Sequence, residues 1–285
     1  MPQRHASDWA GNASPVASSE RSPKLPLVFA HANGFTGRSY QSFLAPLGER
    51  FALHPLDQLG HHPRFPVGNN WLSLRDELLS RLPEGDTQVI GVGHSLGGML
   101  MAMAAEKAPE RFRCVVAMDP PWMLGLDALA IKLAKRTGLV DRITPAGRSL
   151  GRRAHWPDHQ TMSEDLRRKG LFRNFTSEAF SDYLAGAVRQ HEGGGVGLAF
   201  SPETEVAIFR HLPDHLQGLP RRLKVPLALL VGRDTDLLTA RRRRRFARLG
   251  VPVELVPGGH MFPMEHPEAC RQALCATLDR LLEPS

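Results

Sequence analysis

The stretch Gly91-Val92-Gly93-His94-Ser95-Leu96-Gly97-Gly98 decides the fold of this chain. An apolar run over 87–92 leads into it, and a run rich in Ala and Met over 99–107 leads out of it. This order predicts a strand, a tight turn and a helix. Ser95 stands at the centre of Gly-x-Ser-x-Gly, where a Cβ on either flanking glycine would clash across the turn. The turn predicts that the Ser95 hydroxyl is presented as a nucleophile at the carboxyl end of the strand. The alternative is a tight structural turn that happens to hold a serine.

Strand-like and helical runs alternate on both sides of this stretch. Apolar runs predict strands at 25–30, 51–56 and 114–118, and helical runs are found at 39–48 and 70–82. The alternation resumes later, with strands predicted at 226–231 and 251–256 and helices at 240–249 and 267–282. Such alternation implies right-handed crossovers, so we expect a parallel sheet covered by helices on both faces.

Between these two parts the alternation stops. Helical runs at 128–135, 163–170, 177–190 and 202–212 are joined there by loops rich in Gly, Pro and Arg. We therefore predict an inserted helical cap over 122–222, which divides the α/β core into 25–121 and 223–285. Residues 1–24 are rich in Ser, Ala, Pro and Asn without periodicity and are predicted to form a flexible arm.

Composition and charge exclude several classes of protein. The chain is 42% hydrophobic, which is enough apolar material for a sizeable core, and no run of about 18 apolar residues predicts a membrane span. The net charge of +7 includes the run Arg241 to Arg245, which has no aromatic interleaving and no nucleic-acid motif beside it. We expect a solvated helix there, with an anionic partner as the alternative. The cysteines at 114, 270 and 275 show no disulfide or metal spacing, which favours a reducing, cytoplasmic compartment.

Four motifs in order give the chain a family resemblance: His31-Ala32-Asn33-Gly34-Phe35, the Ser95 turn, Thr235-Asp236-Leu237-Leu238-Thr239, and Gly259-His260 with Glu265 and Pro267 behind it. From about residue 25 to its end, the chain resembles bacterial α/β-hydrolases with a cap whose oxyanion loop reads His-Ala-Asn-Gly-Phe. Nucleophile, acid and histidine follow the family's chain order. Family members often carry two further strands before the oxyanion loop's strand, so a shortened sheet of about six strands is expected here.

A histidine and a carboxylate are needed to activate Ser95. His260 follows a predicted strand and two glycines near the C-terminus and is the predicted base, since histidine titrates near neutral pH. The resemblance favours Asp236 as the acid, because the Leu-Leu-Thr that follows fits the family's register. Asp234, in the same loop, and Asp119, after the preceding strand, remain alternatives.

Backbone amides are expected to form the oxyanion hole. Leu96 begins the helix after Ser95 and supplies the first amide. Alignment on Gly-Phe in the 31–35 loop makes Phe35 the second donor, with Asn33 next in preference. His31 and His94 are predicted to be structural.

Together these parts predict a serine hydrolase that cleaves an ester, thioester, lactone or carbon–carbon bond through an acyl-enzyme on Ser95. The predicted substrate is an apolar, uncharged acyl compound, and its pocket walls are expected to include Trp122, Phe172, Phe175 and Tyr183. No cofactor and no metal are predicted, because the pair His61-His62 lacks further ligand spacing. An acyltransferase on the same machinery, or a ligand-binding protein with vestigial catalysis, are the alternatives.

Overall fold

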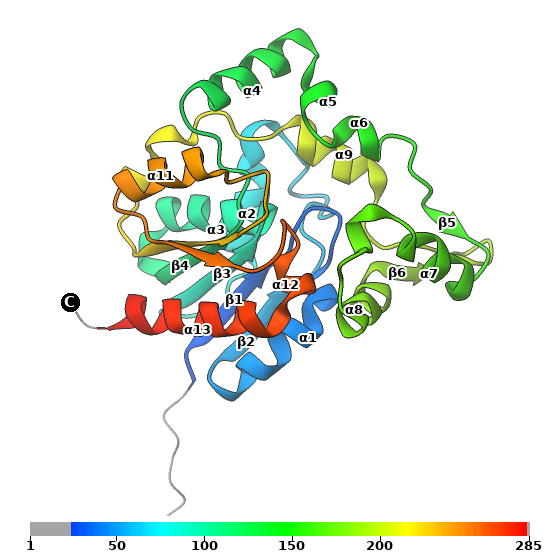
Figure 1. Ribbon diagram of the computed structural model, residues 1–285, viewed down its shortest axis with the longest axis horizontal. Helices are drawn as coiled ribbons and strands as arrows, with labels where there is room; N and C mark the ends of the chain where they lie inside the picture. Colours follow the sequence, from blue (N-terminus) through cyan, green and yellow to red (C-terminus); the bar gives the residue numbers. More distant parts are fainter. Residues whose placement is uncertain (1–23, 284–285) are drawn as a thin grey trace, which may run out of the picture.

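A six-stranded parallel sheet forms the centre of the molecule, with strand order β2-β1-β3-β4-β8-β9 (Figure 1). The computed structural model describes residues 24–283, so the predicted arm, apart from residue 24, lies outside the described residues. The strands are β1 (Pro26–Ala30), β2 (Ala52–Leu56), β3 (Val89–His94), β4 (Phe112–Met118), β8 (Leu227–Gly232) and β9 (Val253–Val256). The predicted parallel sheet of about six strands is confirmed.

Helices cover both faces of this sheet. One face packs on α2 (Leu72–Ser80), α3 (Leu96–Lys107) and α11 (Ala240–Arg248), and the other on α1 (Gln41–Leu44) and α13 (Pro267–Leu282). In Figure 1, α13 runs along one side of the sheet, and α2 and α3 lie on the opposite side. Alternate strand residues point to opposite faces, so Val28 belongs to the first core cluster and Leu27 to the second.

Short 3-10 helices complete the part of the chain outside the insertion. They are η1 (Gly37–Tyr40), η2 (Ala45–Glu49), η3 (Asn69–Trp71) and η4 (Pro109–Arg111). The run predicted as one helix over 39–48 is therefore broken into η1, α1 and η2, which include a proline and end near a glycine. The one-turn helix α12 (Phe262–Glu265) precedes α13.

The long insertion between β4 and β8 is mixed in structure. Its helices are α4 (Leu126–Thr137), α5 (Val140–Ile143), α6 (Ala146–Ser149), α7 (His159–Arg167), η5 (Gly170–Phe172), α8 (Ser177–Ala187), α9 (Pro202–Arg210), η6 (Leu216–Gly218) and α10 (Leu219–Arg222). It also contains an antiparallel sheet of β5 (His155–Trp156), β7 (Val196–Leu198) and β6 (Val188–Gln190), in that order. The helices expected in the insertion are present, and the small sheet was not expected, because strands of two or three residues are too short to show an alternating pattern.

The insertion lies along the edge of the sheet where the strands end. Figure 1 places α4, α5 and α6 on one side and α7, α8 and the small sheet on another. Close contact is visible at Gly186 on α8, where a Cβ would lie 2.6 Å from the backbone nitrogen of Ser39. The Thr36 hydroxyl donates to the carbonyl of Gly186 at 3.0 Å. Within residues 24–283, no helix has both the length and the apolar character needed to cross a lipid bilayer.

Candidate active site

Ser95 occupies a strained turn between β3 and α3. Its φ of +53° and ψ of −114° lie in a region that residues with a side chain seldom adopt. The flanking glycines make the turn sterically feasible: a Cβ on Gly93 would lie 2.3 Å from the carbonyl carbon of Gly97, and one on Gly97 would lie 2.1 Å from the backbone oxygen of Ala30. Ser95 remains partly exposed, while the other residues of 91–100 are buried. The turn therefore presents this hydroxyl at the carboxyl edge of the sheet.

His260 bridges Ser95 to a buried carboxylate. Its Nε2 lies 3.1 Å from Ser95 Oγ, and its Nδ1 lies 2.6 Å from Oδ2 of Asp119. With Asp119 ionised, Nδ1–H donates to the carboxylate, and Nε2 is free to accept the serine proton. The loop that carries His260 is held by Glu265, whose Oε2 accepts from the backbone N–H of Gly259 at 2.6 Å.

The carboxylate at His260 belongs to Asp119 and not to Asp236, so the expectation that Asp236 contacts the histidine is corrected. Asp119 ends β4, the strand beside β3, and its side chain is fully buried. Asp236 and Asp234 are both exposed in the loop after β8. That loop supplies Thr235 instead, whose hydroxyl donates to Asp119 Oδ2 at 2.6 Å. The loop that carries Asp236 thus reaches the buried carboxylate through Thr235, whereas the carboxylate beside His260 is that of Asp119 on the neighbouring strand.

Backbone strain also marks Asp119. Its φ is +40°, and its N–H donates to the carbonyl of Leu230 on β8 at 2.8 Å. The left-handed geometry turns the chain sharply at the end of β4 and directs the carboxylate toward His260. No sequence motif marked this residue, since a lone Asp before two prolines reads as an ordinary turn. The available signal in the sequence is its position directly after the predicted strand at 114–118.

The 31–35 loop lies beside the start of α3. Gly97 donates its N–H to the carbonyl of His31 at 3.1 Å. Phe35, the donor expected first for the oxyanion hole, uses its amide in a tight turn, donating to Ala32 at 3.2 Å. Among the described residues, the amides of Asn33 and Leu96 donate to no protein acceptor. The geometry therefore favours Asn33 over Phe35 beside Leu96.

Two buried histidines connect the loops around Ser95. His31 donates from Nδ1 to the Ala32 carbonyl at 2.8 Å and accepts from the Leu59 amide at Nε2. His94 accepts from the Tyr40 hydroxyl at 2.7 Å and donates from Nε2 to the backbone oxygen of His260 at 2.8 Å. Burial lowers the pKa of His31 to about 4 and holds that of His94 well below its ordinary value. Both rings therefore stay neutral, and their predicted structural role fits these contacts.

An aromatic cluster gathers around Phe35. Its ring centroid lies 5.1 Å from that of Tyr183 and 6.4 Å from that of Phe175, and Phe172 lies 4.6 Å from Tyr183. Three of the four residues predicted to line the substrate pocket are thus brought together beside the 31–35 loop. Trp122 is placed elsewhere: it is fully buried against Phe246 of α11, and its indole donates to the carbonyl of Leu216.

The arginine run on α11 is not uniformly solvated. Arg242, Arg243 and Arg245 are half-buried and donate to backbone carbonyls of the chain segments at 237, 238 and 124. Arg242 and Arg245 also lie 3.0 and 3.8 Å from Asp127 on α4. Arg242 and Arg245 therefore tie α11 to the insertion, Arg243 holds the loop that precedes α11, and Arg241 and Arg244 are exposed.

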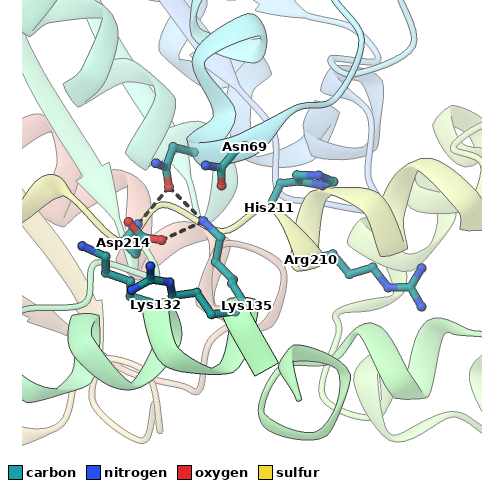
Figure 2. A pocket seen from close by; sticks show the side chains of 8 residues that line it. Asn69, Lys132, Lys135, Arg210, His211 and Asp214 are labelled. Carbon is teal, nitrogen blue, oxygen red and sulfur yellow. Dashed lines mark hydrogen bonds and ion pairs between the residues drawn. The ribbon is translucent and has the colours of Figure 1, made fainter. Parts of the chain in front are cut away.

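A hollow on the surface of the insertion lies apart from this site. A cavity of about 620 Å³ lies against α4 and the end of α9 and is lined mostly by basic and amide side chains (Figure 2). The Lys135 ammonium in it donates to Asn70, to Asp214 and to the carbonyl of Leu212, at 2.8 to 3.0 Å. Arg210 is paired with Asp141. Lys135 and Arg210 are thus already paired with carboxylates of the protein.

Comparison with known proteins gives the same fold. The model of the alpha/beta hydrolase family matches residues 27–273. The chain belongs to this family. It is 25% identical over 264 residues to the 2-(acetamidomethylene)succinate hydrolase of Mesorhizobium japonicum, covering 89% of this chain and 87% of that protein.

Solved structures share the fold of this chain. A crystal structure of E-2-(acetamidomethylene)succinate hydrolase superposes with a TM-score of 0.72 at 24% identity, covering 90% of this chain and 92% of the other. A thermophilic esterase from Thermogutta terrifontis gives a TM-score of 0.62 at 21% identity, covering 91% of each chain. These likenesses establish the alpha/beta hydrolase fold.

Proposed function

We propose that this member of the alpha/beta hydrolase family is a serine hydrolase that cleaves an ester-type bond through an acyl-enzyme on Ser95. The observation that carries the proposal is the hydrogen-bonded series Ser95 Oγ, His260 and Asp119, with distances of 3.1 and 2.6 Å. Each group is in the place that nucleophilic catalysis requires: a nucleophile, a base beside it and a carboxylate that orients the base. The hydrolase and esterase names of similar proteins agree with it.

The reaction follows from this geometry. His260 Nε2 takes the Ser95 proton as Oγ attacks the carbonyl carbon, and the Leu96 and Asn33 amides stabilise the oxyanion. The carbon–oxygen bond to the leaving group then breaks, and that group departs with the proton from His260. Water, deprotonated by His260, attacks the acyl-enzyme, and Ser95 recovers its proton as the acid leaves. Asp119 stabilises the imidazolium in both halves of the cycle.

We further propose that the insertion acts as the cap over this centre. Phe175 and Tyr183 come from it and pack on Phe35 of the 31–35 loop, and Phe172 packs in turn on Tyr183. These rings provide an apolar wall beside the proposed oxyanion hole, which supports an acyl substrate with an apolar part.

Labelling with a fluorophosphonate tests the assignment of the nucleophile. The wild-type protein is expected to gain one label, mapped to Ser95 by peptide mass spectrometry, because only an activated serine reacts with this probe. Ser95→Ala is expected to lose the label and about four to six orders of magnitude in ester turnover. Labelling of a different serine, or none on a folded wild-type sample, would overturn the proposal.

A further inference from the structure

Arg152 lies in the insertion between α6 and β5, with one edge of its guanidinium firmly held. Its Nη1 is 2.8 Å from Oε2 of Glu205 on α9, and the Glu205 side chain is only 9% exposed. Ser149 donates from its hydroxyl to Oε1 of the same carboxylate at 2.9 Å. Glu205 therefore forms an ion pair with the guanidinium, while its buried Oε2 makes no hydrogen bond among residues 24–283.

The opposite edge of this guanidinium has no hydrogen-bond partner among residues 24–283. Nε and Nη2 of Arg152 are shielded from solvent, and neither has an acceptor among residues 24–283. Asn33 contributes a further buried atom without a partner, its Oδ1, while its Nδ2 donates to the backbone oxygen of Glu205 at 3.0 Å. Burying polar groups without partners destabilises a fold, so a cluster of them indicates a bound ligand.

A second arginine shows what this edge fits. Arg210 uses the same two nitrogens, Nε and Nη2, to hold both carboxylate oxygens of Asp141 at 2.9 and 2.6 Å. Such a paired, parallel arrangement is the strongest contact between a guanidinium and a carboxylate. The free edge of Arg152 has the shape and charge to hold a carboxylate in the same way.

The Arg152–Glu205 pair lies against the proposed oxyanion loop. A Cβ on Gly34 would be 3.3 Å from the carboxyl carbon of Glu205, so only one carboxylate separates the guanidinium from the 31–35 loop. Tyr183, whose ring packs on Phe35, is close to both charges: burial raises its pKa to about 12, which the charge of Arg152 opposes. A group held by Arg152 therefore lies on the side of the insertion that packs on the 31–35 loop.

We propose that Arg152 binds a free carboxylate of the substrate, so that the acyl compound cleaved here is the monoester, or a related monoacyl derivative, of a dicarboxylic acid. This inference rests on the proposed function. Glu205 acts as a positioning residue for the guanidinium, and the aromatic cluster contacts the carbon chain between the two carbonyl groups. Burial raises the pKa of Glu205, and the charge of Arg152 opposes that shift. The expected substrate thus has an apolar part and a carboxylate, in contrast to the uncharged acyl compound that the sequence alone predicts.

Matched esters test the proposal. Monomethyl esters of the four-, five- and six-carbon diacids are compared, by acid release, with methyl esters of the monoacids of equal chain length. The wild-type enzyme is expected to favour the diacid ester in at least one pair by about tenfold or more in kcat/KM. Arg152→Gln is expected to lower that kcat/KM by about 10–100-fold and to change the neutral ester by less than about threefold. Arg152→Lys keeps the charge but loses the paired geometry and is expected to recover only part of the loss.

Arg153→Gln is the matched control, because Arg153 is the exposed neighbour of Arg152 and donates only to the carbonyl of His155. It is expected to leave both esters unchanged. An equal fall for charged and neutral esters in Arg152→Gln, or no preference in wild type, would overturn the inference while the serine mechanism stands. Calorimetric binding of glutarate to wild type, lost in Arg152→Gln, supports the inference even without ester turnover, and absence of ester turnover would count against the proposed function alone.

Discussion

The carboxyl edge of the central sheet and the insertion fix their polar groups in different ways. At the sheet edge, backbone hydrogen bonds from neighbouring strands hold the residues: Ser95 donates to Met118, and Asp119 donates to Leu230. In the insertion, side chains hold one another, as Ser149 and Arg152 hold Glu205. Backbone hydrogen bonds between neighbouring strands thus form the frame that carries Ser95 and Asp119 of the proposed chemistry. The proposed contacts with the substrate are made by side chains of the insertion, which can be substituted without changing the residues at the sheet edge.

The largest effect on ester turnover is expected from substitution of Asp119, the carboxylate that contacts His260. Asp119→Asn is expected to reduce ester turnover by roughly 10⁴-fold with the fold intact, because an amide at this position favours the wrong tautomer of His260. Asp236→Asn is expected to cost less than about tenfold, since Asp236 is exposed. Steady-state kinetics of both variants on one ester measure the difference. If Asp236→Asn is the crippling change, the placement of the acid is wrong.

Stability at low pH is expected to depend on the same frame. The pKa of His31 is lowered from 6.5 to about 4 by burial, so below pH 6.5 the unfolded chain binds a proton that the folded chain does not. The free energy of unfolding should therefore fall as the pH drops from about 6.5 to 4, by roughly 3 kcal/mol from His31. His94 acts in the same direction, because burial lowers its pKa too. Urea unfolding at several pH values measures this slope.

Two histidine variants test whether buried histidines cause this dependence of the unfolding free energy on pH. His31→Asn should flatten the dependence of unfolding free energy on pH, whereas substitution of the exposed His54 by Gln should leave it unchanged. Glu77 and Glu205 act with the opposite sign, since burial raises their pKa values. A stability that stays constant between pH 6.5 and 5 in wild type would contradict the neutral, buried state of His31.

A smaller effect is expected at Thr235. Its hydroxyl and His260 Nδ1 both donate to Oδ2 of Asp119, and Oδ1 has no partner among the described residues. Thr235→Val removes one of these two side-chain donors and is expected to lower kcat by about tenfold, through weaker orientation of the carboxylate. Thr235→Ser should restore most of the activity, because it keeps the hydroxyl. Equal losses in the Val and Ser variants would show that the methyl group, and hence packing, is what matters.

The strands and helices of the central sheet were largely predictable from sequence, whereas the packing within the insertion was not. The order of strands and helices around Ser95 follows from local apolar patterns, and α13 has the predicted bounds of 267–282. The proposed nucleophile and base follow from the same local patterns. Asp119 is only an alternative to Asp236 at the level of sequence, because its role depends on β4 lying beside β3, which is a property of the folded sheet. The boundaries of the cap and the cytoplasmic location remain predictions.

Arg152 and Glu205 could not have been selected from sequence. They lie on separate elements of the insertion, and each stands among other charged residues without a motif. Their pairing depends on the way α6 and α9 pack, which no local pattern encodes. The same reason explains Trp122, where an aromatic residue in the insertion suggested a pocket wall but packing against α11 gave it a place in the core.

The smallest expected effect is a change in preference for acyl length, which should differ between Phe175 in the aromatic cluster and Trp122 in the core. Phe175 lies in the cluster around Phe35, whereas Trp122 is fully buried against Phe246. Phe175→Ala removes a wall of the proposed acyl pocket, so kcat/KM for longer acyl chains should rise severalfold relative to shorter ones. Trp122→Phe should leave this ranking unchanged and lower the free energy of unfolding by about 1–3 kcal/mol, because it leaves a cavity and an unpaired carbonyl at Leu216. A series of esters of increasing acyl length, measured beside urea unfolding for both variants, provides the comparison. If Trp122→Phe changes the ranking and Phe175→Ala does not, substrate contacts the core side of the insertion, and the aromatic cluster around Phe35 serves packing alone.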